Sequence, residues 1–231
     1  DYVYDDLNTT AQQLINCGLN NLFGEIYWFY PSNSSEIVNR MVSYNYLDSS
    51  PQRQIWVTSS LNRTTWSDSA VFGKPHGTEY TAGNDVSFDV VGNTEGRTAY
   101  FEHETGTDQV EAGSTTAIAA SVESGDYDIT VTKEGGATLQ GDGEFLMKIR
   151  RFLPDFISQT GNTQITLNLR DYPNSSQASS PLGPFTVSSS TTKVDTRARA
   201  RAVSLKIANT GTAQDWKLGT FRLDIQPDGR R

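Results

Sequence analysis

The sequence has very few of the residues that support disulfide frameworks or common enzyme chemistry. It contains one cysteine, Cys17, so no disulfide can form within the chain. Its two histidines are His76 and His103, and no G-x-S-x-G motif is present to place a nucleophilic serine. No run of about 18 apolar residues occurs, so we expect no membrane-spanning helix. A chain of this length can still bury roughly 70% of its unfolded surface without a disulfide or a metal.

The remaining candidates for chemistry are also better explained by structure. Glu102, His103 and Glu104 could supply metal ligands, but in a strand only Glu102 and Glu104 would share a face. We therefore expect His103 to be a structural histidine. The segment 141–144 is expected to be a turn, because it lacks the calcium-loop pattern. Cys17 is expected to be a small buried residue on a short helix. The sequence thus predicts a protein that is not an enzyme and has no cofactor or metal.

Charge is distributed unevenly along the chain. Residues 1–140 carry six Lys and Arg and nineteen Asp and Glu, a net charge of −13. Residues 141–231 carry thirteen basic and eight acidic residues, a net charge of +5. This asymmetry favours electrostatic docking between copies or with a partner, and ordinary solvated surfaces are the alternative. The total of −8 argues against a protein that grips duplex DNA, although it is compatible with a channel through which DNA slides.

The hydropathy pattern predicts one helix followed by many strands. A helix is expected from an N-cap at Thr9 or Thr10 to about Gly18. Beyond it the apolar residues recur every second position, which predicts strands at 26–30, 41–46, 54–58 and 65–72. Four short strands in succession favour an antiparallel meander, the unit of a propeller blade or of one sheet in a sandwich.

Strands are expected in the remainder of the chain as well, at 86–90, 98–102, 116–123, 127–132, 145–150, 165–169, 203–207 and 221–225. Residues 173–192 are rich in Pro, Ser, Gly and Thr and are expected to form a long loop. The predicted fold class is all-β, with antiparallel meanders that belong to a β-propeller and a C-terminal β region. We divide the chain into a connecting segment with a short helix (1–20), an acidic β-meander (21–140) and a basic C-terminal region (141–231).

A row of arginines is the most distinctive feature of the basic region. Arg197, Arg199 and Arg201 occupy alternate positions, so one strand would carry all three on one face. Apolar residues take over the same parity at 203–207, which requires either a bulge or arginines that project beyond the core. Because Arg pairs with carboxylates through two hydrogen bonds, we expect these three residues at a subunit or partner interface. A nucleic-acid contact is the weaker alternative, since no aromatic residues are interleaved.

Several segments occur together in an order that is similar to one known family. They are Trp28-Phe29-Tyr30-Pro31, Tyr44-Asn45-Tyr46-Leu47, Trp56, the segment 61–68 (LNRTTWSD), His103-Glu104-Thr105-Gly106, the segment 151–156 (RFLPDF), the arginine row, and the segment 216–230 (WKLGTFRLDIQPDGR). Across residues 20–231 this sequence resembles the tail hub or nozzle proteins of short-tailed bacteriophages, which are also described as tail tubular or packaged-DNA-stabilising proteins.

The resemblance implies a β-propeller protein that forms a ring, usually a hexamer, below the portal and its adaptor. Such a ring closes the DNA channel and docks fibres or a needle, with DNA passing through without sequence-specific binding. It also implies a virion location in the tail, after assembly in the host bacterial cytoplasm. Proteins of the family are longer, so residues 1–231 would correspond to the last blades and the terminal region.

Two other functions are compatible with the sequence. An all-β receptor- or glycan-binding tail module would present exposed tryptophans in a shallow groove. A polysaccharide hydrolase would hold two carboxylates about 5 to 9.5 Å apart in a cleft.

Overall fold

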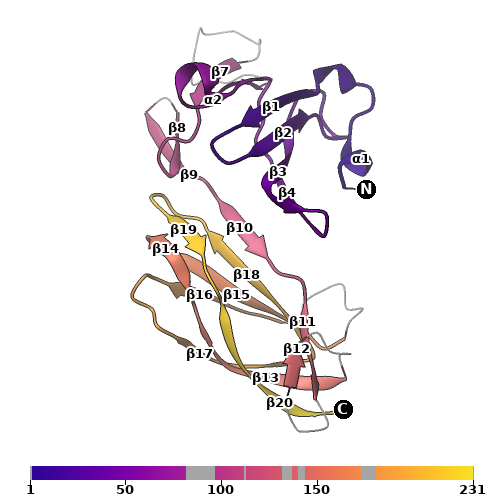
Figure 1. Cartoon of the computed structure of the whole chain (residues 1–231), viewed down its shortest axis with the longest axis vertical. Helices are drawn as coiled ribbons and strands as arrows, with labels where there is room; N and C mark the ends of the chain where they lie inside the picture. The colour runs from indigo at the N-terminus through magenta and orange to yellow at the C-terminus, as the bar shows by residue number, and fades with distance from the viewer. Residues whose placement is uncertain are drawn as a thin grey trace. The chain divides into compact units, whose positions relative to one another are not determined.

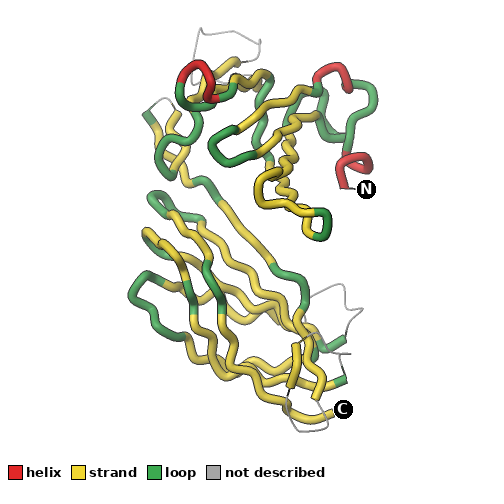
Figure 2. Tube along the Cα trace, in the orientation of Figure 1, coloured by secondary structure: helices red, strands yellow, loops and turns green. Residues whose placement is uncertain are grey.

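Strands make up most of the protein (Figure 2). The structure, a computed structural model, describes residues 2–81, 97–111, 113–131, 137–139, 144–172 and 180–230. Within these ranges all ladders between strands are antiparallel, so the all-β prediction is confirmed, and the described strands do not by themselves show a closed propeller. The helical segments there are short, namely α1 (Tyr2–Asp6), the 3₁₀ helix η1 (Gln12–Leu14) and α2 (Ser69–Phe72). No helix in the described ranges is long and apolar enough to cross a membrane.

The chain forms two compact units, unit 1 (Asp1–Thr105) and unit 2 (Gly106–Arg231). Unit 1 contains a four-stranded sheet in the order β1-β2-β3-β4 and a three-stranded sheet in the order β5-β6-β7 (Figure 1). The first sheet is a meander of consecutive strands, as expected for this part of the chain. The strands are β1 (Asn16–Asn20), β2 (Glu25–Tyr30), β3 (Arg40–Ser50), β4 (Arg53–Ser59), β5 (Thr65–Ser67), β6 (His76–Thr81) and β7 (Arg97–Glu102).

The predicted N-terminal helix is wrong, because its residues form η1 and strand β1 instead. The strand pairs along its whole length with β2, so that Gly18 lies opposite Tyr27. The Trp66 side chain packs directly on Gly18, where an added Cβ would lie only 2.2 Å from Trp66 Cδ1. Cys17 is consequently exposed on a strand rather than buried on a helix. The contact between Gly18 and Trp66 joins residues distant in sequence, and tertiary contacts of this kind override a weak helix propensity.

The segment 65–72 also differs from the prediction of a single strand. Its first part is β5, which joins the second sheet, and its last part is α2. The fourth strand of the meander is therefore β1. Aromatic rings form the core between these elements, in which Trp66 contacts Tyr27 edge to face with centroids 5.1 Å apart and Phe29 at 5.7 Å. Val38, Met41 and Leu61 complete this core.

Unit 2 contains two larger sheets and two strand pairs. One sheet has the order β12-β11-β18-β15-β16, with β10 also paired to β18, and the other has the order β17-β13-β20. The strands of the first are β10 (Ala120–Glu123), β11 (Tyr127–Val131), β12 (Ala137–Leu139), β15 (Thr163–Arg170), β16 (Ser180–Val187) and β18 (Ala202–Asn209). Those of the second are β13 (Phe145–Leu153), β17 (Val194–Ala200) and β20 (Arg222–Arg230). The pairs are β8 (Asp108–Glu111) with β9 (Ser114–Ala117), and β14 (Phe156–Thr160) with β19 (Asp215–Leu218).

Both sheets of unit 2 contribute side chains to one apolar core, so they face each other as the layers of a sandwich. Ile165 and Leu167 come from the first sheet, and Met147, Ile149 and Phe152 come from the second, all with at most 1% of their surface exposed. Ile165 and Leu167 alternate with polar residues, as the sequence predicted for 165–169. In β13 the predicted alternation holds over Met147–Arg150 only, since Leu146 is also buried and Phe152 lies three positions after Ile149. The predicted strand 116–123 is divided into β9 and β10, and 86–90 lies outside the described residues.

Part of the predicted loop 173–192 is a strand. Residues 180–187 form β16, which pairs with β15 and with no other described strand, and is therefore an edge strand of the described sheet. An edge strand tolerates Pro181 and Pro184 because one side of its backbone needs no hydrogen-bond donors. Proline content thus misidentified an edge strand as a loop. The structure does not describe 173–179.

The boundary between the compact units does not coincide with the change of charge predicted at 140/141. Unit 1 has five basic and thirteen acidic residues, a net charge of −8, whereas unit 2 has fourteen of each and a net charge of zero. The acidic strands β8–β12 thus fold together with the basic C-terminal strands. One ion pair that joins them links Arg170 Nε to Asp126 Oδ2 at 3.2 Å.

Candidate functional site

Two of the three predicted interface arginines lie on the outer face of β17. Arg197 and Arg199 are exposed, while Thr196, Ala198 and Ala200 point into the core with 9%, 2% and 0% of their surface exposed. Small core residues on β17 and long cations on its outer face follow directly from the alternation of side chains in a strand.

The prediction that one strand carries all three arginines is wrong. Arg201 occupies a bend between β17 and β18, where the chain leaves the second sheet of unit 2 and enters the first. This bend explains why the apolar residues at 203–207 have the parity of the arginines. The Arg201 guanidinium is held at the bend, since its Nη1 donates to the Glu144 backbone oxygen at 2.7 Å.

The neighbouring strand β13 adds cations that the sequence did not single out. Its ladder to β20 shifts register between Ile149 and Arg151 with the extra residue on β13, which identifies a bulge at Arg150. The ladder to β17 shifts at the same place, but there the extra residue is on β17. A bulge lets consecutive side chains deviate from strict alternation, so Lys148, Arg150 and Arg151 all lie on the outer side. The Lys148-Ile149-Arg150-Arg151 run was the only sequence signal for this cluster.

These strands enclose an open groove of about 520 Å³, which we call the basic groove. It contains five cationic and two acidic side chains. The lining residues are Lys148, Arg150, Arg151, Asp195, Thr196, Arg197, Arg199 and Asp228.

Acidic residues neutralise only part of the groove. Arg199 Nε donates to Asp228 Oδ2, and Arg199 Nη2 donates to the Asp228 backbone oxygen at 3.2 Å. Arg151 Nε lies 3.2 Å from Asp224 Oδ2 and 3.9 Å from Asp195 Oδ1. Among the described residues the other three cations of the groove make no ion pair. They are Lys148, Arg150 and Arg197.

A second polar cluster lies inside unit 1, around Arg63. This arginine is 5% exposed. Its Nη1 contacts Glu79 Oε2 at 2.8 Å, and its Nε donates to His103 Nε2 at 2.9 Å. The guanidinium carbon also lies 4.2 Å from the centre of the Phe101 ring. We call these four residues the Arg63 network, and its burial and mutual pairing indicate a structural role.

His103 occupies this network rather than a metal site. Its Nε2 accepts the hydrogen bond from Arg63, so this nitrogen is not available as a ligand. Burial, and then the neighbouring charges of Arg63 and His76, lower the pKa of His103 to about 4. Within the described ranges no group of three His, Cys, Asp or Glu is placed to hold a metal ion. Most of the predicted turn 141–144 lies outside those ranges.

The prediction that Glu102 and Glu104 share a face is wrong. Strand β7 ends at Glu102, and Glu104 adopts a positive φ of 58°, so strand alternation does not extend to it. The Glu102 carboxylate lies 3.3 Å from Lys74 Nζ, whereas that of Glu104 accepts a hydrogen bond from Asn20 at 2.8 Å. Burial raises the pKa of Glu104, and the hydrogen bond from Lys74 is the main cause that lowers the pKa of Glu102.

Acidification is expected to destabilise unit 1 through His103. The unfolded chain binds the His103 proton with a pKa near 6.5 and the folded chain only near 4, so stability is complete above pH 6.5 and is lost as pH falls below it. Allowing for partial solvation, we expect a loss of about 1–2 kcal/mol by pH 4.5. Urea unfolding at several pH values, followed by tryptophan fluorescence, measures this loss.

H103Q is the matched control, because glutamine can still accept from Arg63 but does not titrate in this range. We expect a smaller loss of stability between pH 6.5 and 4.5 in H103Q than in the unmodified chain. Equal losses in the two proteins would show that other groups cause the effect.

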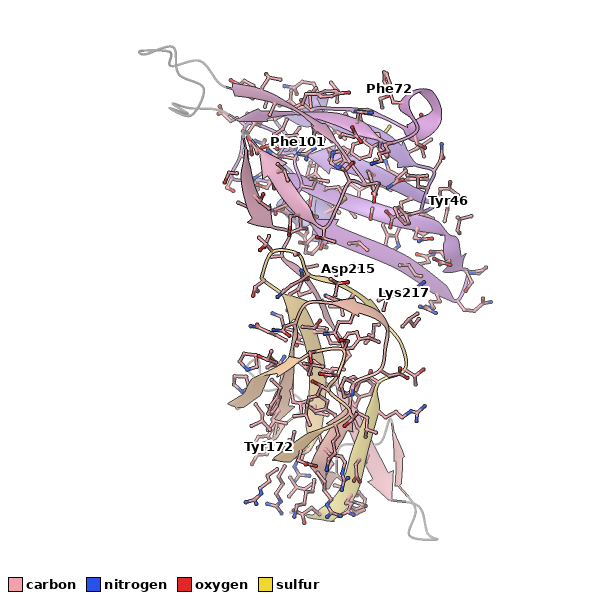
Figure 3. The ribbon with its side chains drawn as sticks, turned by 90° about the vertical axis from the view of Figure 1, so that its left-hand side faces the viewer. Tyr46, Phe72, Phe101, Tyr172, Asp215 and Lys217 are labelled. Carbon is pink, nitrogen blue, oxygen red and sulfur yellow. The ribbon has the colours of Figure 1, made fainter. Side chains whose placement is uncertain are left out.

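Aromatic side chains are also exposed on unit 1. On the first sheet, Trp56 is 54% exposed and its ring lies 4.7 Å from that of Tyr44 and 6.1 Å from that of Trp28. Tyr46 on β3 and Phe72 on α2 also project from unit 1 (Figure 3). The exposed tryptophan expected for a glycan-binding module is therefore present, although unit 1 also has other exposed rings.

Motif residues that are distant in sequence meet in the fold. In unit 1 the rings of Trp66 and His103 are 4.6 Å apart. In unit 2 the Gly219 backbone nitrogen donates to the Asp155 oxygen at 2.8 Å, and Phe156 contacts Trp216 edge to face at 6.4 Å. No protein-family model matches the chain, and a search of the curated proteins finds no significantly similar sequence.

Proposed function

We propose that this chain is a structural, non-enzymatic component of a phage virion, part of the tail hub or nozzle of a short-tailed phage. The observation that carries the proposal is that motifs resembling that family are in contact with one another in each compact unit. Arg151 of one motif pairs with Asp224 of another at 3.2 Å, and Trp66 packs on both Phe29 and His103. Motifs that pack together are expected to be retained together, because each contact depends on both partners.

The proposal extends to a propeller and a ring. The meander β1-β2-β3-β4 is a four-stranded antiparallel sheet, which is the composition of a propeller blade. The exposed side chain of Trp56 on this sheet would then face a neighbouring blade. Copies of the chain would form a hexameric ring below the portal and adaptor, with fibres or a needle docked to it.

The proposed mechanism is mechanical. The ring closes the DNA channel, and contacts with fibre or needle proteins transmit the signal that opens it. Unit 1 carries a net charge of −8, and acidic residues that line the channel would repel the phosphate backbone and prevent the DNA from adhering. The protein would be assembled in the bacterial cytoplasm and would remain in the tail of the virion.

Electron microscopy of phage particles, with antibody or tag labelling of this chain, tests the proposal. We expect a sixfold ring at the base of the portal and adaptor. Labelling of fibre tips, or a trimer, would contradict the ring and favour a receptor-binding module.

A second candidate function, glycan binding, is favoured by the exposure of Trp56 next to Tyr44. Sugar rings pack on exposed aromatic faces because both present apolar surface. Binding of the chain to a panel of bacterial polysaccharides, with W56A as the variant and F72A as the control, tests it. Binding that W56A abolishes and F72A retains would support this function instead.

A further inference from the structure

We propose that the basic groove of unit 2 binds carboxylates on unit 1 of a second copy of the chain. This head-to-tail contact rests on the proposed ring and names the surfaces that would build it. Of the three arginines predicted at an interface, Arg197 and Arg199 line the groove and Arg201 does not. Lys148, Arg150 and Arg151 of β13 line it as well, so the proposed set of interface residues differs from the predicted one.

The groove contains more positive charge than its own acidic residues neutralise. Lys148 lies directly opposite Arg199 in the β13–β17 ladder, and like charges at directly opposed positions destabilise a sheet. Asp228 compensates Arg199, but within the described ranges Lys148, Arg150 and Arg197 make no ion pair. An anion that enters the groove would offset the repulsion among these cations, so the charge of the groove favours binding of an anion.

The composition of the groove favours carboxylates over a nucleic acid. Arg150 and Arg197 can each hold a carboxylate through two parallel hydrogen bonds. Asp195 and Asp228 also line the groove, and their charges would oppose a continuous row of phosphates more than a protein surface of mixed charge. None of the described residues that line the groove is aromatic, so they offer no stacking platform of the kind on which single-stranded nucleic acids depend.

The charge of the chain favours a second copy as the occupant. Unit 1 has a net charge of −8 and unit 2 of zero, so every copy of the chain supplies an acidic unit at the same concentration as the groove. Glu36 and Asp48 are among the exposed carboxylates of unit 1. A twofold contact between two basic grooves would bring like charges together. A contact from unit 2 of one copy to unit 1 of the next is heterologous, and such contacts close into rings when the rotation permits.

The test is self-association of the whole chain, measured by sedimentation velocity and native mass spectrometry over a range of concentration and salt. We expect R150E/R197E to weaken association by at least about tenfold, because two favourable charge contacts become repulsive. The control K206E/K217E makes the same change in net charge at exposed positions outside the groove (Lys217 is labelled in Figure 3), and we expect it to associate like the unmodified chain. Higher salt should weaken association of the unmodified chain and of this control.

R150Q/R197Q separates loss of charge from misfolding, and circular dichroism with thermal unfolding should show that it retains the fold. We expect it to associate less tightly than the unmodified chain but more tightly than R150E/R197E.

Equal effects of the groove and control variants would overturn the inference, as would a monomer at every concentration. Groove-dependent binding of a short DNA duplex, with no effect on self-association, would overturn it in favour of nucleic acid. A sixfold ring in particles whose assembly tolerates R150E/R197E would overturn this contact and leave the proposed function intact.

Discussion

Replacing Arg63 with methionine is expected to lower the free energy of unfolding of unit 1 by about 3 kcal/mol. The Arg63 side chain is 6% exposed and its partner Glu79 is 18% exposed, so R63M removes the Arg63 cation from beside a poorly solvated carboxylate. The variant also removes the hydrogen bond to His103 and the contact with the Phe101 ring. Methionine retains much of the apolar volume of the arginine stem, so the loss measures the polar contacts rather than a cavity.

Chemical denaturation followed by tryptophan fluorescence measures this effect, because three of the four tryptophans belong to unit 1. The control is R53M, in which an exposed arginine of the same unit is replaced, and a change within about 0.5 kcal/mol is expected there. The double variant R63M/E79L removes both charges and should recover part of the loss, because the poorly solvated carboxylate is then removed together with the Arg63 cation. Equal stability of R63M and R53M would contradict a buried ion pair.

Replacing Phe152 with alanine is expected to destabilise unit 2 by about 3–5 kcal/mol. Phe152 is 0% exposed. Its ring stacks on that of Phe221 with centroids 5.3 Å apart and meets Phe185 edge to face at 5.6 Å. These rings come from β13, from the residue before β20 and from β16, so truncation opens a cavity where both sheets of the sandwich meet.

Hydrogen exchange read by mass spectrometry assigns this loss to unit 2, because it reports the opening of each strand separately. F152A should accelerate exchange in β13, β15 and β18 together. I157A is the control, since Ile157 lies in the same unit and is 67% exposed, and its exchange rates should remain close to those of the unmodified chain. Faster exchange in β13 alone would indicate that the two sheets do not share a cooperative core.

Local periodicity was sufficient to predict the strands that bury one face. In β15 the buried residues Ile165 and Leu167 alternate with partly exposed ones, and β13 repeats the pattern from Met147 to its bulge. The outward direction of Arg197 and Arg199 was predictable for the same reason. A side chain on a strand faces one of two sides, so the sequence alone determines which residues lie together on a face.

Only the tertiary structure decided which faces lie next to each other and where strands end. The first predicted helix became β1 because Trp66, 48 positions after Gly18 in the sequence, packs on that glycine. Arg201 was separated from its row by a bend between sheets, and Lys148 was placed opposite Arg199 by strand pairing. The acidic residues 106–140 were joined to the basic strands by the same fold. These outcomes depend on contacts between segments far apart in the chain, which no local pattern of residues encodes.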